Sequence, residues 1–575
     1  MAIVGIDLGT TNSAIGCYVE GKPKLLPNPL GNVLTPSVVG VDDDGTLIVG
    51  EAARELQVIA PHRCASIFKR HMGTDWSTEL NGLRFDAANL SAAVLRSLLC
   101  DATHHLGEVV DRAVISVPAY FNERQRRATI AAGELAGIKV ERILNEPTAA
   151  SIAYGLHDDG EEKVIAVLDL GGGTYDVSIV AIFGGVVEVQ ASSGECFLGG
   201  EDFTSAIVSR LLEREGLIYE HAEIERPLLV SRMRRLCETV KLELSRETET
   251  QTRMPSVSGD AQWSDRAHRI SRDEFERWTE PLLDRTEPPL RRALGDAKIT
   301  VDDVDMVVLV GGATRMPSFR DRVTRRFGKS PQCSIDPDQV VALGATIQAG
   351  LLDRDEALDD LVVTDVSPFT LGVETSKDFG TEVRSGYFTP IIFRNQPIPA
   401  SRSKAFATMH ANQTTITLKV FQGESRLVEG NVLLGELDVE GIPLGPRGQQ
   451  IECRFTYDLN GVLEVEATIV ETQEKKTLVI SRNARPLSES ELHEALEAMR
   501  ELKTDPRDKA QNRLLMKRAE RVIEEMPMGA RNELESLLDG FEEAMSARDD
   551  AVTARFQTAI QELLDQWEME SRRDR

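Results

Sequence analysis

The chain has 575 residues, 41% of them hydrophobic and 28% charged, which is typical of a globular protein with room for three or four domains. Its net charge of −27 excludes nucleic acid and anionic membranes as favoured partners, because phosphate binding needs clustered Lys and Arg. We expect no membrane span and no export signal, and the seven scattered cysteines, without a CxxC pair, predict reduced thiols in a cytoplasmic protein.

The first motif is an apolar strand that ends in a polar turn. Residues 3–8 contain Asp7 and lead into Gly9-Thr10-Thr11-Asn12, after which an alternating strand runs through Val19. The pattern predicts strand, tight turn, strand.

Strands then alternate with helices. Residues 90–99 have the composition and apolar spacing of a helix, residues 112–118 read as a strand, and residues 124–136 are rich in helix-forming Arg, Ala and Glu. This order predicts an α/β domain from residue 1 to about 357.

A second glycine turn, at residues 169–176, dominates the sequence. Asp169 and Asp176 flank Gly171-Gly172-Gly173-Thr174 between two apolar strands. Three glycines let backbone N–H groups close on an anion, and the two carboxylates suit a hydrated Mg²⁺. The turn therefore predicts a site for a metal–polyphosphate; the alternative is a plain glycine hairpin.

The two turns share one pattern about 160 residues apart, which predicts a duplicated domain that holds one nucleotide from both sides. A third glycine element, residues 311–315, again follows an apolar strand, and no GxxxxGK[ST] motif is present, which excludes a P-loop.

The character of the sequence changes after residue 353. An acidic run, residues 353–360, precedes the apolar island at residues 361–365, which predicts a linker with an edge strand or a segment that docks onto another surface. Short strands such as residues 414–421 and 462–469, the latter after Asn460-Gly461, then predict a β-sandwich.

The last region is helical and charged. Ser488 and Glu491 form a predicted capping box, followed by one apolar helix face at Leu492, Leu496 and Met499, and Pro506 and Pro527 interrupt the region. Its expected role is either a lid or a stabilising appendage.

Taken together, residues 5–13, 117–122, 145–150, 169–176 and 198–203 resemble motifs of the seventy-kilodalton heat-shock (DnaK-like) chaperones. Resemblance is close to about residue 484 and looser in the tail; residues 388–392 and the short tail look like the bacterial HscC subgroup. The resemblance implies an α/β actin-like, duplicated ribonuclease-H-like ATPase domain (1–357), a linker (358–366), a peptide-binding β-sandwich (367–486) and a short α-helical lid (487–575).

The resemblance also implies roles for individual residues, with ATP/ADP and Mg²⁺ as cofactors and K⁺ as a further candidate. Asp7 and Asp169 would hold Mg²⁺ through its waters. The implied catalytic residues are Lys69, which would position the attacking water, with Glu146, Asp169, Thr174 and Asp176. The implied nucleotide-binding residues are Gly9, Thr10, Thr11, Asn12, Gly171, Gly172, Gly173, Thr174, Gly199, Gly200, Glu201, Glu238, Lys241, Ser245, Gly311, Gly312, Arg315 and Asp338.

Two further sets concern clients and coupling. The resemblance implies that unfolded or specific client proteins contact Leu371, Val373, Phe406, Met409, Ile416 and Leu418, although strand alternation requires some of these to be core. It implies a relay and a docking surface for a J-domain cochaperone at Pro118, Arg126, Arg142, Asn145, Pro147, Thr148 and Asp365; Arg142 alternatively only pairs with a carboxylate. A nucleotide-exchange factor is a candidate partner, and a tetratricopeptide partner is not expected.

Several positions depart from the family pattern. Asn12 replaces an aromatic residue, Leu242 replaces an Arg that packs on adenine, and Thr364 replaces an apolar linker residue, which predicts weaker nucleotide affinity and looser coupling. Ser376 and Met409 predict a different client preference.

We expect an ATP-dependent chaperone. The alternatives are a small-molecule kinase of the actin-like fold, which leaves residues 366–575 without a role, and an ATP-gated regulator of one folded partner.

Overall fold

The computed structural model describes residues 2–155, 162–183, 186–255, 263–353, 358, 362–378, 383–458, 461–480, 515, 519, 526, 528–547 and 550–573. Contacts divide the chain into two compact units. Unit 1 covers Met1–Pro368 and unit 2 begins at Phe369. The predicted strand at the linker therefore lies in unit 1, and the exact limits of the four predicted regions stay a prediction.

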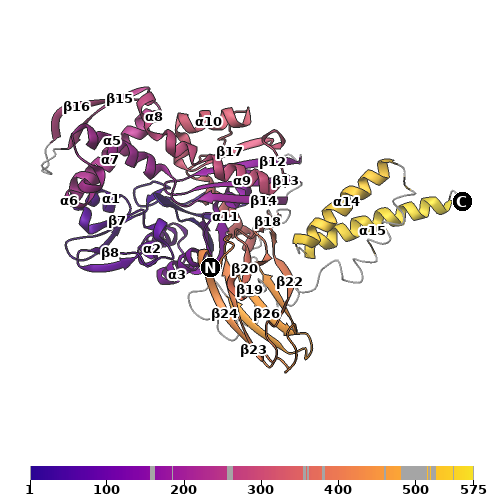
Figure 1. Ribbon diagram of the computed structural model, residues 1–575. Helices are drawn as coiled ribbons and strands as arrows, with labels where there is room; N and C mark the ends of the chain where they lie inside the picture. Colours follow the sequence, from indigo (N-terminus) through magenta and orange to yellow (C-terminus); the bar gives the residue numbers. More distant parts are fainter. Residues whose placement is uncertain are drawn as a thin grey trace. The chain divides into compact units, whose positions relative to one another are not determined.

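Unit 1 contains a first sheet in the order β11-β10-β1-β2-β3, which belongs to the indigo to purple part of the ribbon in Figure 1. Its strands are β1 (Ala2–Asp7), β2 (Asn12–Val19), β3 (Lys22–Leu25), β10 (Val110–Val117) and β11 (Lys139–Asn145). The strands β1, β10 and β11 run parallel, whereas β1, β2 and β3 form an antiparallel meander. The expected strand–turn–strand at the N-terminus is confirmed.

The two helices expected in this part of the chain are also confirmed. They are α2 (Ala87–Leu106) and α3 (Glu123–Ala136), which contact each other. Asp86 and Asn122 cap their first turns, and Gly107 and Gly137 end them in the left-handed conformation that glycine adopts without strain.

A second sheet repeats this plan, with the order β17-β12-β13-β14-β18. Its strands are β12 (Lys163–Leu170), β13 (Tyr175–Phe183), β14 (Val186–Glu195), β17 (Met306–Val310) and β18 (Val362–Val366). Again three strands form an antiparallel meander, and a parallel strand, β17, joins the first of them. The predicted duplication is therefore present, and the apolar segment at the linker forms β18, which pairs in parallel with β14.

Two helices, α4 (Glu146–Gly155) and α11 (Val340–Leu352), join the halves of unit 1. Helix α4 contacts β12, β13 and β14, helix α11 contacts β1 and β2, and the two helices contact each other. A Cβ on Gly344 would lie 1.7 Å from the Ala149 carbonyl oxygen, so only glycine allows this approach. Close helix packing thus fixes the two sheets relative to each other.

The remaining helices of unit 1 complete its second half. They are α5 (Gly200–Arg214), α6 (Tyr219–Glu225), α7 (Pro227–Leu244), α8 (Arg272–Asp284), α9 (Glu287–Ala297) and α10 (Pro317–Phe327), while α1 (Glu51–Ile59) belongs to the first half and contacts α7. The apolar faces of α5 to α10 share one buried core with β12 and β13.

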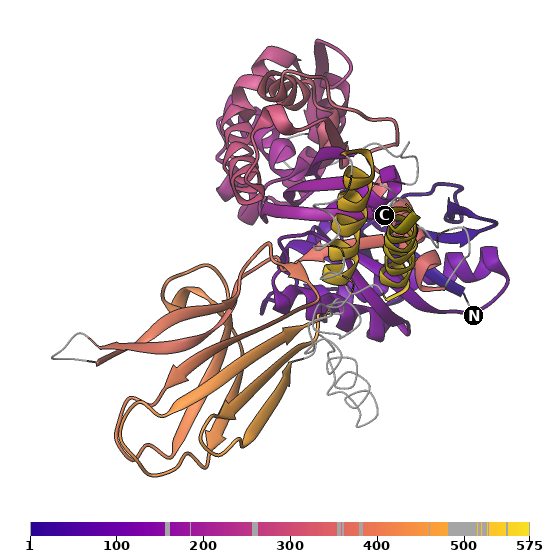
Figure 2. The ribbon, with the colours of Figure 1, turned by 90° about the vertical axis from the view of Figure 1, so that its right-hand side faces the viewer.

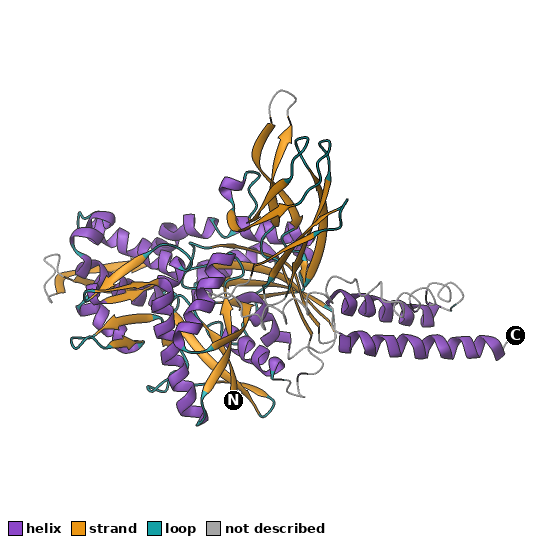
Figure 3. Ribbon diagram, turned by 90° about the horizontal axis from the view of Figure 1, so that it is seen from below, coloured by secondary structure: helices purple, strands orange, loops and turns teal. Residues whose placement is uncertain are grey.

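Unit 2 contains a β-sandwich, as expected. Its sheets have the orders β20-β19-β23-β24 and β22-β25-β26-β27, and Figure 3 shows the region as strands and loops. The strands are β19 (Leu371–Asp378), β20 (Val383–Ile392), β22 (Ala400–Ala407), β23 (Thr415–Gln422), β24 (Val432–Glu440), β25 (Gln450–Tyr457), β26 (Leu463–Ile469) and β27 (Lys475–Ile480). Alternate apolar residues of both sheets meet in one core.

Two helices of unit 2, α14 (Met528–Ala547) and α15 (Asp550–Arg573), contact each other. A helical end of the chain is therefore confirmed. The predicted capping box, the apolar face at residues 492–499 and both prolines lie outside the described residues. Of the helices in the described ranges, none has the length and apolar character to cross a bilayer.

Candidate functional site

The two glycine turns lie against each other in unit 1. A Cβ on Gly172 would lie 1.8 Å from Thr11 Oγ1, and one on Gly173 would lie 2.7 Å from a methyl of Thr10. A Cβ on Gly199 would lie 2.5 Å from the backbone of Gly172. Any side chain at these glycines would therefore push the turns apart, which explains why the sequence places glycine there.

Four carboxylates gather where the strands reach these turns. Asp7 ends β1, Asp169 and Asp176 are register partners on β12 and β13, and Glu146 begins α4. All four side chains are buried or nearly so, and Asp7 accepts a hydrogen bond from Ser116 Oγ at 2.8 Å. Because β1, β10 and β11 run parallel, Asp7 at the end of β1 and Glu146 after β11 lie at the same edge of the first sheet, whereas Asp169 and Asp176 face each other across an antiparallel hairpin.

Burial raises the pKa of three of these carboxyls. It raises the pKa of Asp7 to about 7 and that of Asp176 to about 8, with the negative charge of Glu146 as the second cause in both. The pKa of Asp169 is also raised well above its usual range, first by burial and then by Glu146. A site that keeps this much negative charge out of water favours an incoming cation.

One lysine partly balances the cluster. Lys69 is only 4% exposed, and its Nζ donates to Glu146 Oε1 at 2.7 Å. It lies in the short 3₁₀ turn Phe68–His71, which follows Ile67 in the left-handed conformation with φ 60°. This conformation is strained for a β-branched residue, by about 1–3 kcal/mol, and strain of this kind is concentrated at functional sites.

A cavity of about 700 Å³ opens beside the turns and the carboxylates. Its volume falls in the range of small-molecule sites. It is lined by Leu242 and by most predicted residues, namely Asp7, Gly9, Thr10, Thr11, Asn12, Lys69, Glu146, Asp169, Gly171, Gly172, Thr174, Gly200, Glu201, Glu238, Lys241, Ser245, Gly311, Gly312, Arg315 and Asp338. Asp176, Gly173 and Gly199 do not line it; Asp176 accepts a hydrogen bond from the Tyr120 backbone N–H at 3.2 Å.

The cavity wall away from the carboxylates is held by ion pairs. Lys241 Nζ donates to the Gly200 carbonyl oxygen at 2.9 Å and pairs with Glu238 at 2.7 Å. Arg315 pairs with Asp336 at 2.6 Å and with Asp338 at 2.9 Å. These contacts fix the wall without filling the cavity.

The sequence analysis missed Arg70. Its Nε donates to the Gly173 carbonyl oxygen at 3.0 Å, and its guanidinium also pairs with Asp202. Arg70 therefore ties the first half of unit 1 to the second glycine turn. Its position next to Lys69 was the only available signal, because both partners are more than 100 residues away in the chain.

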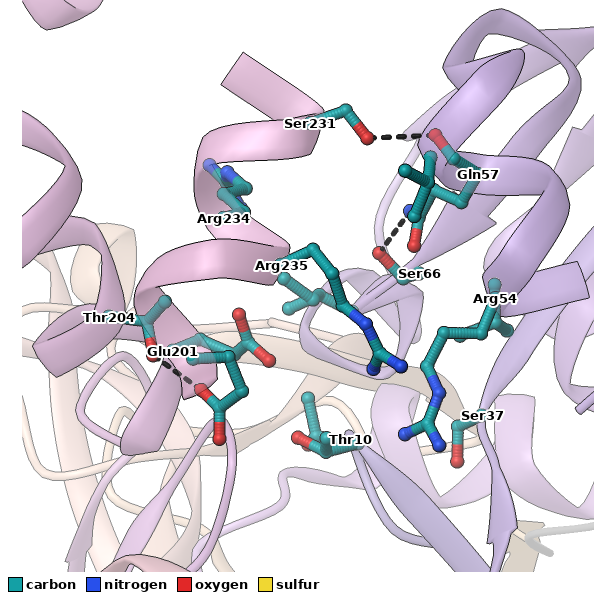
Figure 4. Close-up of a pocket in the computed structure, with 15 residues that line it drawn as sticks. Thr10, Ser37, Arg54, Gln57, Ser66, Glu201, Thr204, Ser231, Arg234 and Arg235 are labelled. Atoms are coloured by element: carbon teal, nitrogen blue, oxygen red, sulfur yellow. Dashed lines mark hydrogen bonds between the residues drawn. The ribbon is translucent and has the colours of Figure 1, made fainter. Parts of the chain in front are cut away.

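A smaller cavity of about 120 Å³ adjoins the larger one. Figure 4 shows Arg54 of α1 and Arg235 of α7 reaching into it toward Thr10, and Ser231 Oγ donates to the Gln57 carbonyl oxygen at 2.8 Å. Thr11 lines both cavities, and its buried Oγ1 has no hydrogen-bond partner within the part of the chain that the structure describes. A ligand oxygen or N–H in the cavity would satisfy that hydroxyl.

Four of the residues predicted to couple the site to the rest of the chain, Arg126, Asn145, Thr148 and Asp365, are joined by hydrogen bonds. Asp365 on β18 accepts from Asn145 Nδ2 at 2.9 Å and from Thr148 Oγ1 at 3.5 Å, and Arg126 donates to Asn145 Oδ1 at 2.6 Å. Burial raises the pKa of Asp365, opposed in part by the charges of Arg126 and Arg142. Pro118 follows β10 directly, and Pro147 is buried in α4 beside Glu146.

The residues predicted to contact a client differ in exposure. Leu371, Val373 and Leu418 are buried in the sandwich core, whereas Phe406 and Ile416 only partly pack against it and Met409 is half-buried. Some of the six are core, as alternation requires. Client contact by any of them stays a prediction, and Phe406, Met409 and Ile416 are the most accessible.

Two comparisons with known proteins agree with these findings. A family model described as "Hsp70 protein" matches residues 3–574. A chaperone protein DnaK of Thermosipho melanesiensis is 37% identical over 563 residues, which cover 95% of this chain and 93% of that relative. The similarity therefore extends over both units.

Proposed function

The chain belongs to the Hsp70 family and is an ATP-hydrolysing chaperone, and we propose that hydrolysis in the unit 1 cavity drives the binding and release of extended apolar client segments by unit 2. The observation that carries the site assignment is the cluster of the buried Glu146, Asp169 and Lys69 with the partly buried Asp7, which lines the cavity beside the two glycine turns. Neither comparison supports the kinase alternative.

The residues at the turns fit a hydrated magnesium ion. Among the described residues, no group of three or more His, Cys, Asp or Glu side chains is arranged to bind a metal directly. Asp7 and Asp169 would instead hold the waters of Mg²⁺, which retains several waters in most protein sites. When bound, Mg²⁺ neutralises charge on the phosphates. K⁺ is a second cation in this proposal.

The chain itself supplies positioning. Thr10, Thr11 and the backbone of residues 171–174 would receive the β- and γ-phosphates, and the unpartnered Thr11 hydroxyl is suited to donate to one of them. Lys69 and Glu146, held together at 2.7 Å, would orient the attacking water. Fixed geometry and charge neutralisation provide most of the catalysis in phosphoryl transfer. Asp176 does not line the cavity and would act on this network electrostatically, since its carboxylate, after burial and Glu146, raises the pKa of Asp169.

The nucleoside would occupy the wall formed by Glu238, Lys241 and Ser245 on one side and Gly312 and Arg315 on the other. Leu242, 51% exposed there, offers no cation to an adenine ring, which supports weaker nucleotide binding than a stacked arginine would give.

Client binding by unit 2 would be marginal by itself. One buried Leu contributes about 1.5–3 kcal/mol, and ordering each client residue costs about 1–2 kcal/mol. We therefore propose micromolar affinity, near −8 kcal/mol, which a coupling free energy of about 1–3 kcal/mol changes by roughly 5–150-fold. ATP would favour fast exchange and ADP slow exchange.

The finer assignments rest on particular residues. The buried network of Arg126, Asn145 and Asp365 supports a route from the cavity to β18 and a surface for a J-domain cochaperone. Residues 388–392 support placement in the HscC-like bacterial subgroup, and with it a cytoplasmic location.

The test measures ATP turnover by the purified full chain with an unfolded apolar peptide, with a sugar or polyol, and without addition. We expect the peptide alone to stimulate turnover, and ATP to release a prebound fluorescent peptide. Stimulation by a polyol with transfer of phosphate to it would refute the chaperone assignment.

A further inference from the structure

Two cations of the sandwich share one aromatic ring. Lys377 Nζ lies 4.7 Å from the centroid of the Tyr387 ring, and the Arg426 guanidinium lies 5.7 Å from the same centroid. Both cations are exposed, and Tyr387 is half-buried. Two positive charges at one ring repel each other, so their arrangement favours an anion that approaches the ring.

Within the described part of the chain, neither cation has an ion-pair partner. Glu374, on the same strand as Lys377, pairs instead with Lys419 at 3.7 Å. Glu424, two residues before Arg426, accepts from the Thr370 backbone N–H at 2.8 Å and from its hydroxyl at 3.0 Å. Because no described carboxylate neutralises them, these two cations leave a local positive charge at the ring that would attract a negatively charged ligand.

The ring and the cations lie on a hairpin that continues past the sheet. Strand β19 pairs with β23 only from Leu371 to Val373, but with β20 as far as Asp378. In Figure 2 these two strands extend beyond the other strands of the sandwich. Thr375 and Tyr387 are register partners, and Arg384, opposite Lys377, adds a third positive charge.

The hairpin begins with Leu371 and Val373, which were predicted to contact a client but are buried in the sandwich core. Lys377 lies four positions after Val373 on β19, a length of about 13 Å along the strand. An extended client segment spans the same length with about four residues, so a client that crosses the sandwich beside Val373 could place an acidic side chain at the ring.

We infer that Lys377, Tyr387 and Arg426 form an anion subsite that receives the carboxylate of an Asp or Glu flanking the apolar segment of a client. The inference rests on the proposed client binding by unit 2 and gives it a specificity: clients with an acidic flank are preferred to clients with a neutral one. Tyr387 positions the two cations, and the cations make the contact.

The experiment measures the fluorescence anisotropy of two labelled peptides with the full chain and ADP. Each peptide has seven apolar residues, followed by Asp-Asp in one and by Asn-Asn in the other. We expect wild type to bind the acidic peptide about fivefold more tightly, because each exposed pair contributes up to about that factor. High salt should remove the preference. The double variant Lys377→Gln/Arg426→Gln should bind both peptides equally, with unchanged affinity for the neutral one.

A charge-matched control is Lys22→Gln/Lys476→Gln, which removes two exposed cations from β3 and β27. It should keep the preference. Equal binding of both peptides by wild type, or a preference retained by Lys377→Gln/Arg426→Gln, would overturn the subsite while leaving client binding intact. Failure of wild type to bind either peptide would instead refute the proposed function itself. Tyr387→Leu should weaken the preference without abolishing neutral-peptide binding.

Discussion

Replacing Lys69 with methionine separates the structural role of this residue from its proposed catalytic one. Lys69 and Glu146 are 2.7 Å apart, and their side chains are 5% and 10% exposed. At an effective dielectric constant of about 20, their gross attraction is about 6 kcal/mol, most of it offset by lost hydration. Lys69→Met leaves the Glu146 carboxylate buried near three raised-pKa carboxyls, which predicts a loss of about 3–5 kcal/mol.

The double variant Lys69→Met/Glu146→Gln removes both charges and should recover most of that loss, because replacing a whole buried pair is often nearly neutral. Hydrolysis should not recover: in both variants, we expect single-turnover rates at least 100-fold lower, the lower bound for a positioned group in proton transfer or water orientation.

Calorimetry of the full chain gives the stability, with the transition of unit 1 identified by its upward shift with Mg·ADP. At about 2.1 cal/mol/K per residue, the loss in Lys69→Met corresponds to a fall of about 5 °C. Lys139→Met is the matched control, since Lys139 is 70% exposed in its 3.2 Å pair with Glu141 and should shift the transition by less than about 1 °C. A double variant as unstable as Lys69→Met, or wild-type hydrolysis in Lys69→Met, would refute the reasoning.

Further predictions concern the metal, pH, coupling and client binding. Asp169→Ala should lose ATP hydrolysis while circular dichroism remains native; normal turnover would contradict its metal role. Burial raises the pKa of Asp7 to about 7 and of Asp176 to about 8. Protonation of these two carboxyls therefore stabilises the ligand-free protein fully below about pH 4, and this stabilisation is lost as the pH rises through 7–8. Its melting temperature should therefore fall from pH 5 to pH 9, and Mg·ADP should flatten this slope; equal slopes would count against a cation at these carboxylates. Thr364→Leu should raise the ratio of peptide-stimulated to basal turnover, and an unchanged ratio would show that linker docking does not limit coupling. Phe406→Asp should abolish capture of unfolded peptides in a pull-down, whereas retained capture of a single folded protein would favour the regulator alternative.

The repeated strand–turn–strand pattern allowed the fold to be predicted, because glycine turns between apolar strands are local signals. Gly9 and Gly171 lie in such turns, and both meanders follow from them. The sandwich could also be predicted, since apolar residues alternate with polar ones along β26 and place Val465 and Ala467 in its core.

The candidate site was predictable only as far as motifs extend. The left-handed Ile67 and the reach of Arg70 to Gly173, 103 residues away, depend on tertiary packing that no local pattern encodes. The same limit applies to Leu371 and Leu418: their apolar character fits core and client contact alike, and only three-dimensional packing shows that they lie in the core.

Strand β18 pairs with β14 over three register pairs, the last of which joins Glu188 to Thr364, and Asp365 adds hydrogen bonds from Asn145 and Thr148. Net hydrogen-bond contributions of about 0.5–1.5 kcal/mol each make this ladder worth roughly 2–4 kcal/mol. That is close to the free energy by which one bound ligand influences another within a protein. The free energy of the ladder that holds the segment between the two units is thus comparable with a coupling free energy, so we expect ligand binding in unit 1 to change the protection of these hydrogen bonds against exchange.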